Sequence, residues 1–231
     1  MSHLTYKYIK QNKGIQTYIS RADDALYSIG YTEHSTTHAE ICAATAHLIL
    51  SKLGHPERVC ELAQIAAYMH DIGNVVNRQD HAQTGAVMAF RLLDCMGMPP
   101  EEIAAIIAAI GNHDENTARP INPIAAAVIL ADKCDVRRSR VRHPVDKQED
   151  EAGKVVTTIQ DIHDRVNYAC VKSQVHVCES GSVLLDLVID EEICPLLDYF
   201  LIFTQRMQLC RNAADSLGTK FELIMNGSRI V

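Results

Sequence analysis

A histidine and an aspartate stand side by side at the end of an apolar helical segment, in the stretch AAYMHDIGN at residues 66–74. Imidazole nitrogens and carboxylate oxygens are common ligands of catalytic transition metals. Successive helix residues point about 100° apart, so His70 and Asp71 cannot both face one pocket from the middle of a helix. At a helix end, which Gly73 predicts, the two side chains can hold one metal ion jointly or reach one ion each.

Two further residues would complete such a site from separate helices. His38 lies on the preceding long helix, and Asp132 lies in AAAVILADKCD, an apolar helix where an unpaired carboxylate is unfavourable. The His-Asp dipeptide alone is a weak signal, because His113–Asp114 and His163–Asp164 repeat it. Histidine and carboxylate side chains from three helices of one bundle are, however, typical of a catalytic metal site.

The order H…HD…D, formed by His38, His70–Asp71 and Asp132, resembles that of the HD-domain superfamily of metal-dependent phosphohydrolases. HDIG is the commonest form of the central motif of that family. The resemblance covers roughly residues 30–142. It implies an all-helical core, metal coordination by these four residues, and hydrolysis of phosphate esters or anhydrides of nucleotides or related small metabolites.

Two more histidines resemble the additional ligands of HD proteins with dinuclear centres. His81 begins a helix in DHAQTGAVMAF, and His113 ends one in AAIGNHD. Their spacing is closest to that of small bacterial hydrolases that split diadenosine tetraphosphate symmetrically. By this likeness His81 and His113 hold a second ion, and Asp71 bridges both. The G-Y-P signature and the double histidine of the cyclic dinucleotide phosphodiesterases are missing, which argues against a cyclic di-GMP substrate.

The chemistry of such a centre follows from its charges. Two adjacent cations lower the pKa of bound water enough to supply a hydroxide near neutral pH, and they neutralise charge that develops on phosphorus. We expect one or two divalent transition-metal ions, with Fe or Mn favoured, although the ligands also accept Co, Ni or Zn. Asp114 is a candidate general acid beside the catalytic Asp71. Candidate contacts to the substrate are Asn74, where the family often has lysine, and His34, Arg78, Lys133, Arg137 and Arg138.

Two other functions remain open at this stage. The same six ligands suit a mixed-valent di-iron oxygenase, and a degenerate site would suit a noncatalytic metal-binding sensor. The basic run DKCDVRRSRVRH at residues 132–143 favours hydrolysis, because it can attract an anionic phosphorylated substrate. The complete ligand set favours catalysis over sensing.

Composition places the chain among ordinary globular proteins, with 231 residues of which 47% are apolar and 22% charged. The formal net charge of −7 disfavours binding to a nucleic-acid backbone. We expect a cytoplasmic protein without membrane association, because apolar runs stay below the roughly 18 residues of a membrane span and the N-terminal residues lack a signal-peptide core. The eight cysteines form no C-x-x-C pair, and we expect reduced thiols.

The predicted fold is mainly α, with a helical HD domain at residues 1–150 and a small C-terminal α+β extension at 151–231. Residues 144–155 are the expected linker. The extension should be a β-β-α-β unit, and an edge strand at its end suggests a homodimer. Helices are expected at 15–29, 33–53, 56–69, 80–96, 99–114, 122–138 and 191–216, and strands in SQVHVCES, SVLLDLVID and KFELIMNGSRIV.

Overall fold

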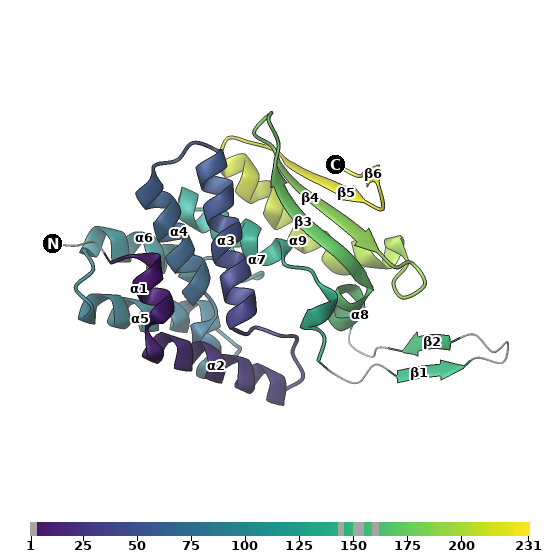
Figure 1. The fold of residues 1–231 in the computed structure, drawn as a ribbon, viewed down its shortest axis with the longest axis horizontal. Helices are drawn as coiled ribbons and strands as arrows, with labels where there is room; N and C mark the ends of the chain where they lie inside the picture. Colours follow the sequence, from purple (N-terminus) through teal and green to yellow (C-terminus); the bar gives the residue numbers. More distant parts are fainter. Residues whose placement is uncertain (1–3, 143–145, 150–154, 159–161) are drawn as a thin grey trace.

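The computed structural model describes residues 4–142, 146–149, 155–158 and 162–231. A helical bundle forms one part of the molecule, and a sheet backed by a long helix forms the other (Figure 1). The bundle consists of α1 (Tyr6–Gln11), α2 (Lys13–Ser28), α3 (Thr36–Lys52), α4 (Glu57–Met69), the 3₁₀ turn η1 (Ile72–Val75), α5 (His81–Cys95), α6 (Pro100–Gly111) and α7 (Pro123–Cys134).

Helix α7 lies at the centre of the molecule. Its start is well defined, because the Asn122 side chain accepts a hydrogen bond from the Ala125 amide and Pro123 occupies the first helical position. Ten of its twelve residues are buried. It packs on α3, α4 and α6 on the bundle side and on α9 (Leu196–Ser216) on the other side. Asp132 therefore reaches the site from the most enclosed helix of the fold.

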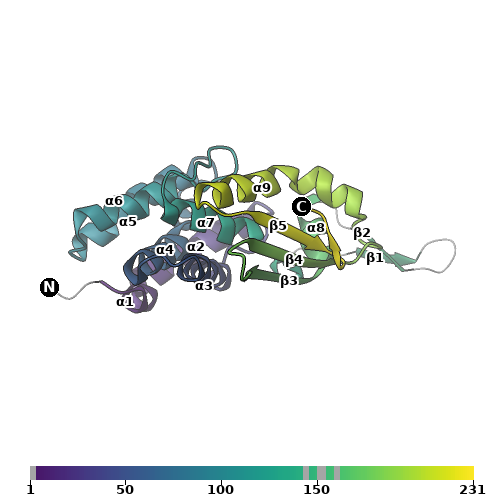
Figure 2. The same cartoon turned by 90° about the horizontal axis from the view of Figure 1, so that it is seen from above.

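The C-terminal part is a four-stranded sheet covered on one face by α9 (Figure 2). Strands β3 and β4 are antiparallel, β4 and β5 are parallel, and α9 makes the crossover between β4 and β5. Strands β5 and β6 meet at the turn Asn226–Gly227, where both residues have positive φ, as a tight hairpin requires. The elements are α8 (Ile162–Ala169), β3 (Cys170–Val177), β4 (Val183–Ile189), α9 (Leu196–Ser216), β5 (Phe221–Met225) and β6 (Ser228–Arg229).

Two hydrophobic cores meet at α7. One fills the bundle between α3, α4, α5, α6 and α7. The other joins the opposite side of α7, including Ile129 and Leu130, to α9 residues such as Phe203 and to the inner face of the sheet. The C-terminal part is thus packed directly on the helix that carries Asp132. The division into domains at residues 150 and 151 stays a prediction.

The mainly α fold with a β-β-α-β extension is confirmed, and the element ends differ in places. Helix α7 stops at Cys134 rather than 138, because Asp135 leaves the helical conformation and Arg137 is extended before the 3₁₀ turn η2 (Arg138–Arg140). Helix α9 begins at Leu196 rather than 191, after a turn that ends at Pro195. The last segment forms the hairpin β5–β6 instead of one strand.

The sequence patterns did not predict α8 or a small hairpin inside the expected linker. Strand β1 (Asp146–Glu149) pairs with β2 (Val155–Thr158) in antiparallel register. Residues 144–145 and 150–154 of the expected linker lie outside the described residues. All eight cysteines are free thiols, in agreement with the prediction.

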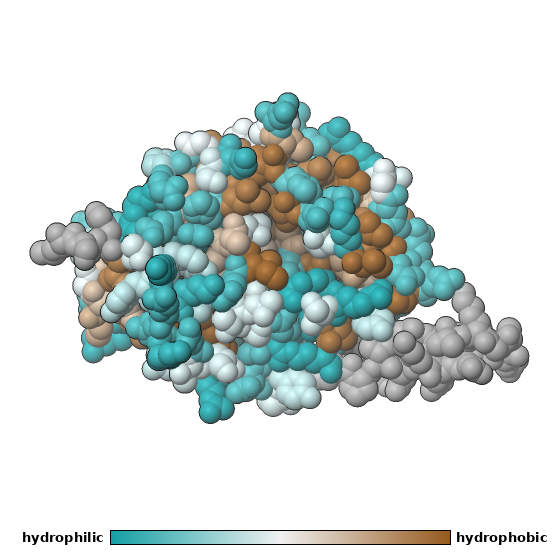
Figure 3. Space-filling view, viewed as in Figure 1, coloured by the Kyte–Doolittle hydropathy of each residue, from teal (hydrophilic) through white to brown (hydrophobic). Residues whose placement is uncertain are grey.

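The surface differs between the two parts of the molecule. Polar residues cover much of the bundle in Figure 3, whereas apolar patches gather over the sheet and its boundary with α3. Val171 of β3 is 60% exposed and Val188 of β4 is 36% exposed. The predicted homodimer stays a prediction. Within the described residues, no helix has both the length and the apolar character needed to span a membrane.

Candidate metal centre

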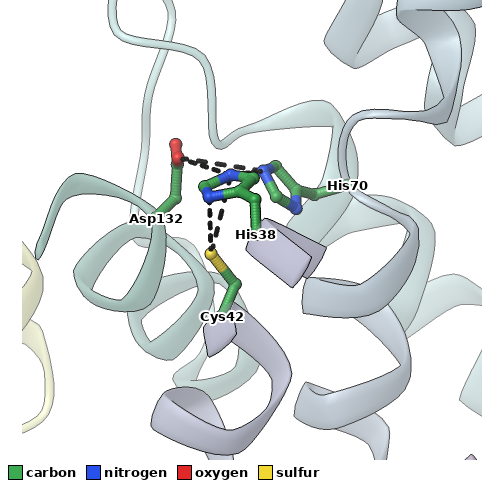
Figure 4. Close-up of side chains that lie close together, drawn as sticks. All are labelled: His38, Cys42, His70 and Asp132. Atoms are coloured by element: carbon green, nitrogen blue, oxygen red, sulfur yellow. Dashed lines mark hydrogen bonds and ion pairs between the residues drawn. The ribbon is translucent and has the colours of Figure 1, made fainter. Parts of the chain in front are cut away.

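Four side chains from three segments of the chain form the first half of the site: His38 from α3, His70 and Asp71 from the end of α4, and Asp132 from α7. Nε2 of His70 lies 3.0 Å from Oδ2 of Asp71 and 3.3 Å from Nε2 of His38. Oδ1 of Asp132 lies 3.5 Å from Nε2 of His38 and 3.8 Å from Nε2 of His70 (Figure 4). Ligands at about 2.0–2.2 Å from a common ion lie roughly 3–3.5 Å from one another, so this spacing fits one metal ion.

Two more histidines form the second half around the other oxygen of Asp71. Nε2 of His81 and Nε2 of His113 are 3.2 Å apart. Oδ1 of Asp71 lies 3.4 Å from the first nitrogen and 3.7 Å from the second. Asp71 therefore presents one oxygen to each half, which is the arrangement of a carboxylate that bridges two ions.

The orientation of the imidazole rings explains why these nitrogens fit a metal. In each ring Nδ1 faces a hydrogen-bond acceptor, and a neutral imidazole has a single N–H to donate. Its Nε2 then keeps a free lone pair, and the two close Nε2–Nε2 contacts become favourable when a cation lies between them. The Nδ1 acceptors are the carbonyl oxygens of Ala67 for His70 at 2.7 Å, Arg78 for His81 at 3.0 Å and Ile110 for His113 at 2.6 Å, and the Asp135 carboxylate for His38 at 2.6 Å.

A close contact between two backbone segments brings the halves together. Gly73 lies in η1, just after His70 and Asp71, against the start of α5. A Cβ added at Gly73 would lie 2.0 Å from the carbonyl oxygen of His81 and 2.5 Å from the amide nitrogen of Gly85. Glycine is therefore required at this position for His81 to approach Asp71.

Asn74 orients Asp71. Its Nδ2 donates to the carbonyl oxygen of Asp71 at 3.0 Å and to Oδ1 of the same residue at 2.9 Å. Its own Oδ1 accepts from Arg78 at 3.2 Å. Asn74 is buried and does not line the cavity, so the structure does not place it in the predicted contact with substrate.

Behind His38 lies a buried carboxylate, Asp135, that the sequence analysis did not single out. Arg137 donates to its Oδ1 at 2.9 Å, and Arg140 donates to its backbone carbonyl at 2.8 Å. Burial disfavours its charged form, but the hydrogen bond from His38 and the charge of Arg140 hold its pKa well below the ordinary value. Asp135 lies three residues after Asp132, about one helical turn, and this spacing is the feature from which its role could have been predicted.

The carboxylates of the centre are ionised even without metal. Burial raises the pKa of Asp132, yet the Lys133 ammonium at 2.6 Å leaves it well below the ordinary value. Burial also lowers the pKa of His70, but Asp71 and Asp132 outweigh it and raise that pKa to about 9. In contrast, burial lowers the pKa of His81 to about 4. The carboxylate oxygens of Asp71 and Asp132 are therefore deprotonated, as metal ligation requires.

A cavity of about 880 Å³ opens in front of the two halves. Asp114, the candidate general acid, lines it with Oδ1 at 3.9 Å from Nε2 of His81. Of the predicted substrate contacts, His34, Arg78 and Lys133 also line the cavity. Other residues that line the cavity include Tyr31, Glu115, Arg140, Asn167, Leu201, Ile202, Gln205 and Arg206, none of which was predicted as a contact.

Two predicted contacts, Arg137 and Arg138, do not line this cavity. Arg137 donates to Glu33 at 2.6 Å in addition to Asp135. Arg138 stacks on the ring of Tyr168 at 4.8 Å. Their charges serve the fold, because each is paired with a neighbour brought in from another segment.

Cys42 lies one helical turn after His38 and points its sulfur at that ring (Figure 4). The Sγ atom is 3.7 Å from both ring nitrogens of His38, so it is aligned with neither lone pair. Burial raises the pKa of the thiol well above its ordinary value. Cys42 thus lies in one group of possible donors with His38, His70 and Asp132, and it is the member of that group that the six-ligand arrangement does not use.

Comparisons with known proteins support this geometry. Residues 35–137 match the family model described as HD domain, a range that contains all six candidate ligand residues. The chain is also 27% identical over 167 residues to the uncharacterized protein MJ1020 of Methanocaldococcus jannaschii. That match covers 63% of this chain and 64% of the relative, which is less than two thirds of the relative's length.

Proposed function

This chain carries an HD domain at residues 35–137, and we propose that it is a metal-dependent phosphohydrolase. Its substrate is a phosphate ester or anhydride of a nucleotide or another small phosphorylated metabolite. The observation that carries the proposal is the bridging position of Asp71, with two Nε2 atoms grouped around each of its carboxylate oxygens. A paired-ion centre of this kind suits phosphoryl transfer better than a single structural ion does.

The donor set fits the metals that such chemistry uses. Four neutral imidazoles and two carboxylates leave the centre net positive once two divalent ions are bound, as an anionic substrate requires. Held by these residues, two divalent ions would supply a hydroxide nucleophile near neutral pH and would withdraw charge from the phosphoryl group. Iron or manganese is the proposed metal, because mixed imidazole and carboxylate donors suit both.

Residues that line the cavity bind the substrate and protonate its leaving group. Lys133 and Arg78 line the cavity beside the ligands and bind the phosphate oxygens. Asp114 lies in the same cavity and gives a proton to the departing oxygen. The volume of about 880 Å³ is ample for a nucleotide, and Tyr31 offers an aromatic face for a base.

A reconstitution experiment tests the proposal. Chelator-treated protein is reloaded with Mn or Fe and offered mononucleotides, sugar phosphates and diadenosine polyphosphates, and release of phosphate or nucleoside phosphate is measured. Hydrolysis should depend on added metal and be lost in the His70→Ala and Asp71→Ala variants. The matched control is His47→Ala, a partly exposed histidine of α3 outside the centre, which should retain full activity.

Three outcomes would contradict the proposal. Hydrolysis that persists in both ligand variants would show that another site is responsible. Oxygen consumption by the iron-loaded protein with an organophosphonate, without phosphoester hydrolysis, would support the di-iron oxygenase. Protein that takes up metal and hydrolyses none of the panel would support a sensor.

A further inference from the structure

We infer that the C-terminal part completes the metal centre through Arg206 and Gln205 of α9, which position the loop that carries His113 and Asp114. The two residues act on the second half of the centre and leave the first half intact. The inference rests on the two-ion centre of the proposed function. It makes Arg206 a positioning residue for His113.

The contact joins segments that are far apart in the chain. Nε of Arg206 donates to Oε2 of Glu115 at 3.0 Å, across 91 positions. Nε2 of Gln205 donates to the backbone carbonyl of Glu115 at 3.3 Å. Glu115 follows Asp114 directly, so α9 holds both the side chain and the backbone of the loop two residues from the ligand.

Arg206 is itself fixed in place. Its guanidinium lies over the ring of Phe203, 4.5 Å from the ring centroid. Phe203 is fully buried in the core between α7 and the sheet. The side chains of Arg206 and Glu115 are only 21% and 23% exposed. A shielded ion pair stacked on a core aromatic ring holds its geometry better than an exposed one, which solvent and rotamer freedom weaken.

Helix α9 also packs on the helix of the first half. It contacts α7, and Sγ of Cys210 lies 3.9 Å from Sγ of Cys134, two residues after Asp132. One rigid helix is therefore bound both to the element that carries Asp132 and to the loop that carries His113. Its position sets the distance between the ligands of the two ions.

The same side of α9 forms a wall of the cavity. Leu201, Ile202, Gln205 and Arg206 line it opposite the metal ligands, at spacings that share one helix face. Loss of the Arg206 contact should release the loop and weaken the second ion, while the first ion keeps His38, His70 and Asp132. Loss of a partner bonded directly to a metal ligand typically weakens metal binding about ten- to a hundredfold, and for a contact two residues from the ligand we expect the lower end of that range.

Stepwise binding of Mn²⁺ to the full chain tests the inference, with equilibrium dialysis for affinities and electron paramagnetic resonance for the coupled pair of ions. The wild type should bind two ions. Arg206→Ala should bind the first with unchanged affinity and the second at least about tenfold more weakly. Arg206→Lys, which keeps the charge, should recover part of the loss. Arg211→Ala is the matched control, because Arg211 lies on the same helix and lines a different groove.

Glu115→Gln gives an independent measurement if Arg206→Ala does not fold, since it removes the charge of the partner and keeps its size. It should weaken the second ion in the same direction. Unchanged second-ion affinity in Glu115→Gln or in folded Arg206→Ala would overturn the role of Arg206 and leave the proposed function standing. A wild-type protein that binds fewer than two ions would overturn the two-ion centre itself.

Discussion

Nδ1 of His38 lies 2.6 Å from Oδ2 of Asp135, a carboxylate 97 positions later in the chain. The pair forms a carboxylate–histidine arrangement whose outer end is held by Arg137 and Arg140. Such a partner fixes the tautomer of the ring and makes its Nε2 a stronger ligand. A charged network thus extends behind the candidate ligands of the metal centre.

Replacement of Asp135 by asparagine should weaken metal binding without removing a ligand. The amide accepts a weaker hydrogen bond from His38 and leaves the buried charge of Arg140 without its partner. We expect Mn²⁺ affinity to fall about ten- to a hundredfold, as measured by equilibrium dialysis. Asp24→Asn, at an exposed ion pair on α2, should bind as the wild type does. Wild-type affinity in Asp135→Asn would contradict the role of the network.

Gly73→Ala should damage both stability and activity. The added methyl group meets backbone atoms of His81 and Gly85, which cannot move aside without separating η1 from α5. We expect a loss of about 2 kcal/mol or more in the free energy of unfolding, measured with urea, because overpacking against backbone is poorly relieved. Gly111→Ala is the control, since its Cβ would lie at an ordinary 3.6 Å from Ala86. An equal free energy of unfolding for Gly73→Ala and Gly111→Ala would show that the close contact at Gly73 does not matter for stability.

The metal-free protein should lose stability at high pH through His70. Its pKa is raised from 6.5 to about 9 by the neighbouring carboxylates, despite burial. The protonated ring stabilises the fold fully below pH 6.5, and this contribution disappears as the pH rises through 9. A shift of this size corresponds to about 3 kcal/mol in the free energy of unfolding.

Urea unfolding in the presence of a chelator, from pH 6 to pH 10, measures this contribution. Other groups also titrate in this range, so the quantity of interest is the difference between the wild type and His70→Gln. That difference should shrink as the pH rises. A difference that stays constant with pH would show that His70 carries no proton in the metal-free protein.

Asp114→Asn should separate metal binding from proton donation. Asp114 lines the cavity and lies beyond the nitrogens that surround Asp71, so metal content should not change. With an alkyl phosphodiester, whose leaving group needs a proton, kcat should fall about a hundredfold or more. With a 4-nitrophenyl phosphodiester the loss should be much smaller, because nitrophenolate departs unprotonated. Equal losses on both substrates would exclude Asp114 as the general acid.

Much of the helical core was predictable from the sequence, because its ligands lie on strongly patterned helices. His38, His70 and Asp132 occupy apolar helical segments where a polar side chain needs a partner. The order H…HD…D then indicates that these residues and Asp71 act together as ligands. The ends of α7 and α9 were less predictable, since Asp135 and Pro195 terminate helical patterns through local backbone geometry that composition does not reveal.

Contacts between distant segments could not be predicted in the same way. Arg137 and Arg138 were expected to bind substrate from their charge alone, but Glu33 and Tyr168 are brought to them by the fold. Conversely, Arg206 gave no signal, because its contact depends on how α9 docks on α7. A single sequence does not show which residues from distant segments contact one another in the fold.

Anomalous X-ray scattering from crystals of the Mn²⁺-loaded protein shows directly whether two ions bind at this centre. We predict two peaks, one on each side of the Asp71 carboxylate. The first should lie among His38, His70 and Asp132, and the second between His81 and His113. A map without a peak beside Asp71, or with one ion held by other residues, would contradict this prediction.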